Sequence, residues 1–89
     1  MSHSTDEREK EAKIKEFFER ARKGVLKYVD QKGGTLPMLE LHEYSLKTYF
    51  IQHQRFSQLM ESLVDENLLE FDSPTETAVL TEKGRNFIQ

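Results

Sequence analysis

The three histidines, His3, His42 and His53, are the side chains best suited to metal or acid–base chemistry in this sequence of 89 residues. The run HEYSL at residues 42–46 begins like the H-E-x-x-H zinc motif, in which two histidines four residues apart on a helix bind one ion. Leu46 stands where the second histidine is required. The sequence contains no cysteine, and its histidines lack metal-ligand spacing. We therefore expect no metal site, and we expect His42 to be a hydrogen-bonded histidine in the core or at its boundary.

No other group of residues has the pattern of a catalytic site. The four glycines do not form a phosphate-binding loop. Serines and carboxylates are plentiful, but no spacing pairs a nucleophile with a base. The sequence therefore predicts that the chain is not an enzyme and uses no cofactor.

Length and composition indicate one small soluble domain. Six Phe and three Tyr supply large apolar side chains for a core, although 33% of the residues are charged. The apolar runs are far shorter than the roughly 20 residues that span a bilayer, and residues 1–11 lack the apolar centre of a secretory signal. The absence of cysteine fits a reducing compartment. We predict a cytoplasmic protein without membrane contact.

The elements that would position functional side chains begin with a long helix that ends at Gly33-Gly34. Residues 1–11 have little to bury and are predicted to be a flexible or frayed extension, with the folded domain at residues 12–89. Phe17 is expected on the flank of the apolar stripe and Leu26 outside it. The stripe at helical spacing consists of Ile14, Phe18, Ala21, Val25, Tyr28 and Val29.

A second helix is predicted at residues 38–47, after a short strand around Thr35-Leu36-Pro37. Leu41 and Tyr44 are expected on the side away from its apolar stripe, where they could form a small patch for a partner. Alternatively, they are isolated apolar surface residues of a common kind. The expected stripe consists of Leu39, His42, Leu46, Tyr49 and Phe50.

A third helix and a hairpin follow within residues 52–88. The helix pattern is the clearest in the chain, and Asn67 is placed to end it in the left-handed conformation. Alternating residues then predict strands around residues 69–72 and 78–80, joined by the turn SPTET, and Thr81 can cap a last helix that carries Phe87 and Ile88 to the core. The expected buried stripe of the third helix is Phe56, Leu59, Met60, Leu63 and Val64.

The run SLVDENLLEF, followed by a turn and AVLTEKGRNFI, resembles winged helix-turn-helix domains of small prokaryotic regulators. In that family the third helix commonly ends in an acidic or small residue, a glycine and an apolar pair, and the second wing strand leads into a Leu-Thr-x-x-Gly-Arg turn. Asn67 departs from the pattern, since glycine is commoner there. The resemblance covers about residues 20–89 and implies an α+β winged helix. The matching residues are Leu63, Val64, Leu68, Leu69, Leu80, Thr81, Gly84 and Arg85.

In DNA-binding members of this superfamily, outward residues in the first half of the third helix contact bases. Glutamine can form paired hydrogen bonds with adenine, and arginine with guanine, so the corresponding residues could bind double-stranded DNA in its major groove. The alternative is an ordinary solvated helix face. The positions that the resemblance assigns are Gln52, His53, Gln54, Arg55, Ser57 and Gln58.

The distribution of charge argues against simple phosphate binding. Residues 1–32 carry nine Lys and Arg against seven Asp and Glu, whereas residues 33–89 carry four against nine. The wing tip, residues 72–77, contains no Lys or Arg, although DNA-binding domains gather basic residues on one face. Lys47, Lys27 and Lys32 are candidates for phosphate contacts. Alternatively, the lysines of the first helix belong to a solvated surface of mixed charge.

Two hypotheses for function follow from these patterns. The first is a DNA-binding transcriptional regulator that acts as a homodimer, because one copy has few basic contacts. The second is a winged-helix protein–protein interaction module or adaptor without DNA binding, which fits the acidic wing.

Overall fold

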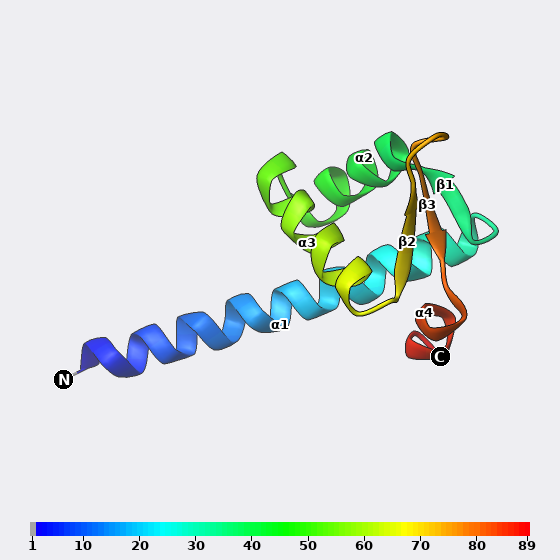
Figure 1. Ribbon diagram of the computed structural model, residues 1–89. Coiled ribbons are helices and arrows are strands. Elements are labelled where there is room, and N and C mark those ends of the chain that lie inside the picture. The colour runs from blue at the N-terminus through cyan, green and yellow to red at the C-terminus, as the bar shows by residue number, and fades with distance from the viewer. Residues whose placement is uncertain (1) are drawn as a thin grey trace.

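The chain folds as four helices and one small antiparallel sheet (Figure 1). The computed structural model describes the backbone of residues 2–89 and the side chains of residues 9–89. This order confirms the predicted α+β winged helix, in which β2 and β3 form the wing. The elements are α1 (Ser2–Gln31), β1 (Thr35–Pro37), α2 (Met38–Tyr49), α3 (His53–Asp65), β2 (Leu69–Asp72), β3 (Thr77–Leu80) and α4 (Glu82–Phe87).

Helix α1 is long, and its N-terminal half projects beyond the other elements (Figure 1). Residues 9–17 are exposed. The backbone of residues 2–11 is part of the helix, and the flexibility expected for residues 1–11 remains a prediction. Gly33 and Gly34 adopt φ values of 93° and 92°, as expected for residues that end a helix. The Gly34 amide donates to the carbonyl oxygen of Val29 at 2.9 Å, which closes the last turn.

The predicted apolar stripe of α1 was wrong at two positions. Leu26 is fully buried, whereas Ile14 is 47% exposed. The C-terminal half of α1 contacts elements on more than one side, including α2, β3 and α4. A helix enclosed in this way buries a wider face than the single stripe that a helix packed on one side would need. Ile14 lies in the N-terminal half of α1 and is 47% exposed, so it is not part of the core.

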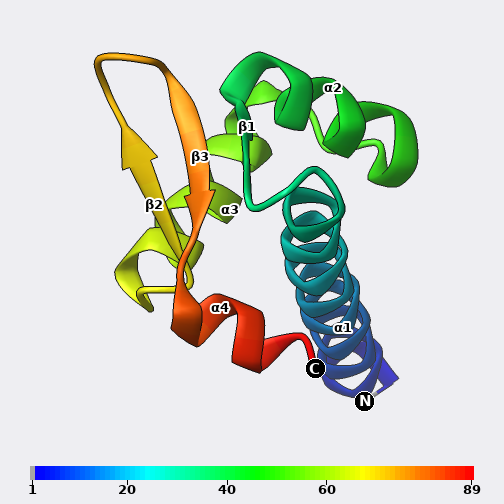
Figure 2. The same cartoon turned by 90° about the vertical axis from the view of Figure 1, so that its right-hand side faces the viewer.

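The sheet joins distant parts of the chain in the order β1-β3-β2, with both pairs antiparallel. Leu69 lies opposite Leu80, and Leu36 lies opposite Ala78. These four apolar side chains are all buried. Figure 2 shows the β2–β3 hairpin extending away from α4 and the C-terminus, while α4 lies beside α1.

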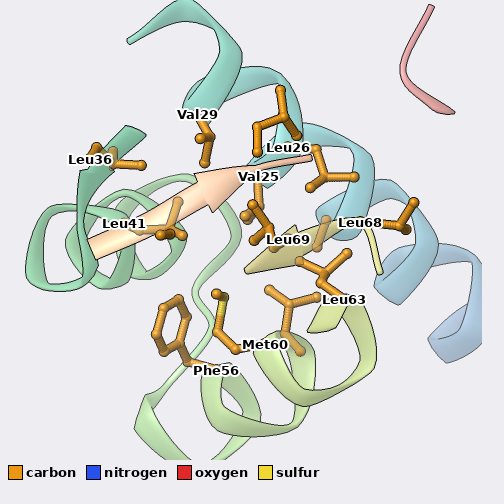
Figure 3. Packing of buried hydrophobic residues seen from close by; sticks show 14 of the residues in the cluster. Val25, Leu26, Val29, Leu36, Leu41, Phe56, Met60, Leu63, Leu68 and Leu69 are labelled. Carbon is orange, nitrogen blue, oxygen red and sulfur yellow. The ribbon is translucent and has the colours of Figure 1, made fainter. Parts of the chain in front are cut away.

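The core lies between α1, α2, α3 and the sheet (Figure 3). Phe56, Leu59, Met60 and Leu63 of α3 are buried in it, as the helical spacing predicts. Val64, the fifth residue of the predicted stripe, is 39% exposed, so its assignment to the core was wrong. It lies at the edge of the buried face, since the position one turn before it is Met60, which is 7% exposed.

The predicted end of α3 and the predicted cap of α4 are confirmed by the structure. Asn67 has φ 61°, the left-handed conformation expected after α3. The Thr81 hydroxyl accepts a hydrogen bond from the Gly84 amide at 2.9 Å and so caps α4. Helix α2 instead runs two residues beyond its predicted end, to Tyr49, and is capped by Phe50, whose φ is 57°. Phenylalanine gives no sequence signal for this conformation, because its side chain disfavours it.

Candidate nucleic-acid interface

The first half of α3 presents a continuous polar surface. All six residues that the resemblance assigned to base contacts are exposed, so the structure brings them together around the first two turns of one helix. The apolar side chains between and after them, Phe56 and Leu59, are buried in the core and fix the orientation of the helix. The six residues are Gln52, His53, Gln54, Arg55, Ser57 and Gln58.

The N-terminus of α3 is also favourable to negative charge. Gln52, the cap residue, makes no side-chain hydrogen bond to the first turn, and that turn contains no acidic residue. Free backbone N–H groups and the helix dipole together favour an anion at such an end. Arg55 lies in the same turn and makes no ion pair with any side chain of residues 9–89. Its guanidinium is therefore free to bind a base or a phosphate group.

The same face becomes acidic further along α3. Gln54 and Gln58 are one turn apart, and Glu61 and Asp65 continue their row at helical spacing. All four side chains are exposed. The row thus changes from amides to carboxylates, and only its first half is suited to contact with DNA.

The wing is held in place and carries acidic groups. The Met38 amide donates to the carbonyl oxygen of Glu76 at 2.9 Å, which ties the wing to the start of α2. The Thr75 hydroxyl donates to the Asp72 carboxylate and also contacts the Thr77 hydroxyl. These bonds organise a turn whose exposed residues include Glu76 and no lysine or arginine. Such a tip would repel a phosphate group.

The three lysines proposed as phosphate contacts do not lie together on one element. Lys47 is exposed in the last turn of α2, close in sequence to the start of α3. Lys27 lies on α1, one turn after Lys23, whose ammonium group is 5.7 Å from the centre of the Phe87 ring in α4. Lys32 follows the end of α1 and lies over the Tyr28 ring at 5.4 Å. Of the three, Lys47 is therefore the one placed within the helix-turn-helix unit.

The predicted partner patch on α2 was wrong, because the helix is turned the other way. Leu41 is fully buried in the core, and Tyr44 stacks on Tyr28 of α1 with ring centres 3.8 Å apart. The apolar side chains that α2 and its cap leave exposed are Leu39, Leu46 and Phe50, all from the stripe that was assigned to the core. His42 lies between the two faces and packs edge-on against Phe56, with ring centres 4.8 Å apart.

An apolar groove of about 980 Å³, which no sequence pattern predicted, lies between the start of α2, one flank of α3 and the wing. Its floor includes Phe56 and Met60, and its lips include Leu39, Val64 and Phe71. The helical spacing had assigned Phe56, Met60 and Val64 to the buried stripe of α3 and Leu39 to that of α2. The structure buries only Phe56 and Met60.

Comparison with solved structures supports this description of the fold. The chain is similar to F93 from STIV, described as a winged-helix DNA-binding protein, with 25% sequence identity and a TM-score of 0.59. The similarity covers 84% of this chain and 79% of that protein. No protein-family model matches the sequence, and no curated protein matches it.

The element order and this similarity place the chain in the winged-helix superfamily. In the part of the chain that the structure describes, no group of three His, Asp or Glu side chains could hold a metal ion. Among the described helices, none is both long and apolar enough to cross a membrane.

Proposed function

We propose that this chain is a transcriptional regulator that binds double-stranded DNA through the first half of α3. The observation that carries the proposal is the exposed row of amides beside a free Arg55 at an uncapped helix N-terminus. The similarity to a winged-helix DNA-binding protein over most of both chains supports it.

The side chains of α3 provide the chemistry for base contacts. Gln54 and Gln58 lie one turn apart on the same exposed face, so both amides can meet the edges of neighbouring base pairs. Arg55 can form two parallel hydrogen bonds with a guanine or bind a phosphate group. Lys47, just before the turn between the two helices, is positioned for a phosphate on the flanking backbone.

The acidic groups limit how much of the molecule can touch DNA. Glu61 and Asp65 on α3 and Glu76 in the wing would meet phosphate groups unfavourably. Contact would therefore be confined to the N-terminal end of α3 and the end of α2. A single copy would neutralise few phosphates, and its affinity would be low.

A homodimer would double these contacts. The projecting half of α1 exposes Ile14 and Phe17. Residues at this i, i+3 spacing lie next to each other on one face of a helix. An isolated helical extension of this length is marginally stable in water, so pairing with a second copy would stabilise it. We propose α1 as the surface that joins the two copies.

The test is a fluorescence anisotropy titration of the protein with mixed-sequence duplex DNA at about 50 mM salt, where phosphate attraction is strong. Binding should be detectable and should weaken as salt rises. Arg55→Ala should weaken it by about 5-fold or more, the low end of the range for a base contact. The control is Arg85→Ala, which removes another exposed arginine, one that lies on α4 and pairs with Asp30. Absence of binding at low salt, or equal effects of the two variants, would refute the proposal.

A second candidate function is a protein-interaction module without DNA binding. The acidic wing and the groove with exposed apolar lips favour it. Detection by light scattering of a stable complex between the protein and a partner, together with no DNA binding at low salt, would select this function over the first. A strictly monomeric protein that retains no partner would exclude it.

A further inference from the structure

From the apolar groove beside α3 we infer a docking site for an amphipathic helix of another protein, one that carries basic residues beside its apolar stripe. This inference deepens the second candidate function by naming the surface and the chemistry of the partner. It does not require the chain to bind DNA.

The groove is formed by three separate elements. Phe56 and Met60 of α3 are nearly buried and make its floor. Leu39 at the start of α2 is 71% exposed, and Phe71 of β2 is 50% exposed, so the lips stand open to solvent. Exposed apolar side chains that surround one concave surface, in contrast to scattered single residues, mark a site of interaction.

The shape of the groove suits a helix. Two of its three walls are helices, α2 and α3, and its volume of about 980 Å³ can take several large side chains. A helix docked in such a groove places apolar anchors at i, i+3, i+4 and i+7 along one stripe. An enclosed small-molecule site would instead hide its apolar lining, whereas Leu39 is among the most exposed apolar residues here.

The charge around the groove selects a basic partner. Glu61, Asp65 and Glu76 are among its lining residues. No lysine or arginine lines it among the side chains of residues 9–89. Lysines or arginines beside the apolar stripe of a docked helix would therefore meet carboxylates on both the α3 and wing sides. An acidic helix would be repelled.

Docking would also occupy part of the proposed DNA interface. His53 and Ser57 line the groove, and both belong to the exposed set on the first half of α3. A helix in the groove and DNA on α3 would therefore compete for the same end of α3. This competition, unlike the docking itself, rests on the proposed DNA binding.

The first test measures binding of a labelled peptide of about 18 residues, or five helical turns, to the full chain without DNA. The probe has leucines at i, i+3, i+4 and i+7 and lysines beside them. One control peptide replaces each lysine with glutamate, and another scrambles the lysine peptide so that the leucines share no face. The lysine peptide should bind at least 10-fold more tightly than either control. Equal binding of the three peptides, or no binding, would overturn the inference.

Variants then locate the site. Leu39→Ser should weaken binding of the lysine peptide by about 5-fold or more, while Phe50→Ser, which removes an exposed apolar side chain outside the groove lining, should not. Glu61→Lys combined with Asp65→Lys should reverse the preference toward the glutamate peptide. Equal effects of Leu39→Ser and Phe50→Ser would overturn the assignment.

Sedimentation of the free protein distinguishes a second copy as the occupant. If Leu39→Ser converts a dimer into a monomer, the groove belongs to contact between copies and the inference of a separate basic partner is wrong. An unchanged oligomeric state supports it. Because the peptide assay contains no DNA, its failure leaves the DNA-binding proposal standing, and a failure of DNA binding leaves the peptide result interpretable.

Discussion

Gly24 of α1 lies directly against the Tyr49 side chain of α2, so a Cβ atom on Gly24 would be 1.7 Å from the Tyr49 hydroxyl oxygen. The contact explains a glycine in the interior of a helix, which costs about 1 kcal/mol relative to alanine. It also joins α1 to the end of α2, where Tyr49 packs edge-on against Phe17. Burial raises the pKa of Tyr49 above its ordinary value, with a further contribution from Tyr44.

Gly24→Ala should destabilise the protein even though alanine favours helices. The added methyl group must displace the Tyr49 ring, and overpacking of this kind costs about 1–3 kcal/mol, whereas helix propensity returns about 1 kcal/mol at most. Thermal unfolding should show a lower Tm. In a Tyr49→Ala background the same change should raise the Tm, because the obstacle is gone. A rise in Tm in both backgrounds would contradict the close contact.

Leu41 and Leu39 should respond in opposite ways to truncation. Leu41 is fully buried, so Leu41→Ala should cost about 2–5 kcal/mol of the free energy of unfolding. Leu39 is 71% exposed, and Leu39→Ala should change that free energy by no more than about 0.5 kcal/mol. Urea denaturation measures both. Similar losses for the two variants would mean that α2 presents the other face to the core.

Phe50→Gly should stabilise the protein. Phe50 is 82% exposed and has φ 57°, a conformation that costs a residue with a side chain about 1–2 kcal/mol. Because glycine also loses more freedom on folding, the expected net gain is about 0.5–1 kcal/mol. Asn67→Gly, at φ 61°, is the control and should gain less, because asparagine tolerates this conformation. Calorimetry of the two variants would settle the comparison, and a lower Tm for Phe50→Gly would contradict it.

Glu66→Gln should destabilise the protein through Arg22. The Arg22 guanidinium is nearly buried and donates to Glu66 just after α3 and to Glu19 on its own helix. Loss of one carboxylate leaves a buried charge with poorer compensation, and we expect a cost of about 1–2 kcal/mol, since Glu66 itself is half exposed. Glu70→Gln, an exposed carboxylate of β2, should be neutral within about 0.5 kcal/mol. Chemical denaturation measures the free energy of unfolding of both variants. Equal changes in the two would exclude a stabilising role for the Arg22–Glu66 pair.

The C-terminal half of the fold could be predicted because its signals are local. The spacing of Phe56, Leu59 and Leu63 specifies a helix and its buried face. Asn67 and Thr81 mark where one element ends and the next begins, since each provides a backbone conformation or a cap that neighbouring residues need. The exposure of Gln54, Ser57 and Gln58, which lie opposite the buried stripe, follows from the same helical period.

The orientation of α2 could not be predicted in the same way, because apolar residues occur on both of its faces. Either Leu39 and Leu46 or Leu41 and Tyr44 could have faced the core. The structure buries Leu41 with Ser45, whose hydroxyl donates to the Leu41 carbonyl oxygen at 2.9 Å and so has a hydrogen-bond partner inside the core. Local spacing contains no information about which neighbour a helix meets.

The sequence by itself determined the order of helices and strands and the polar character of α3, because these depend on hydrophobic period, caps and turns within a few residues. Only the tertiary structure decided that Leu26 is buried, that Leu39 is exposed, and that Leu39, Val64 and Phe71 line one apolar groove. Those outcomes depend on which elements pack together. Residues 39, 64 and 71 lie on three different elements, and the folded chain alone brings them side by side.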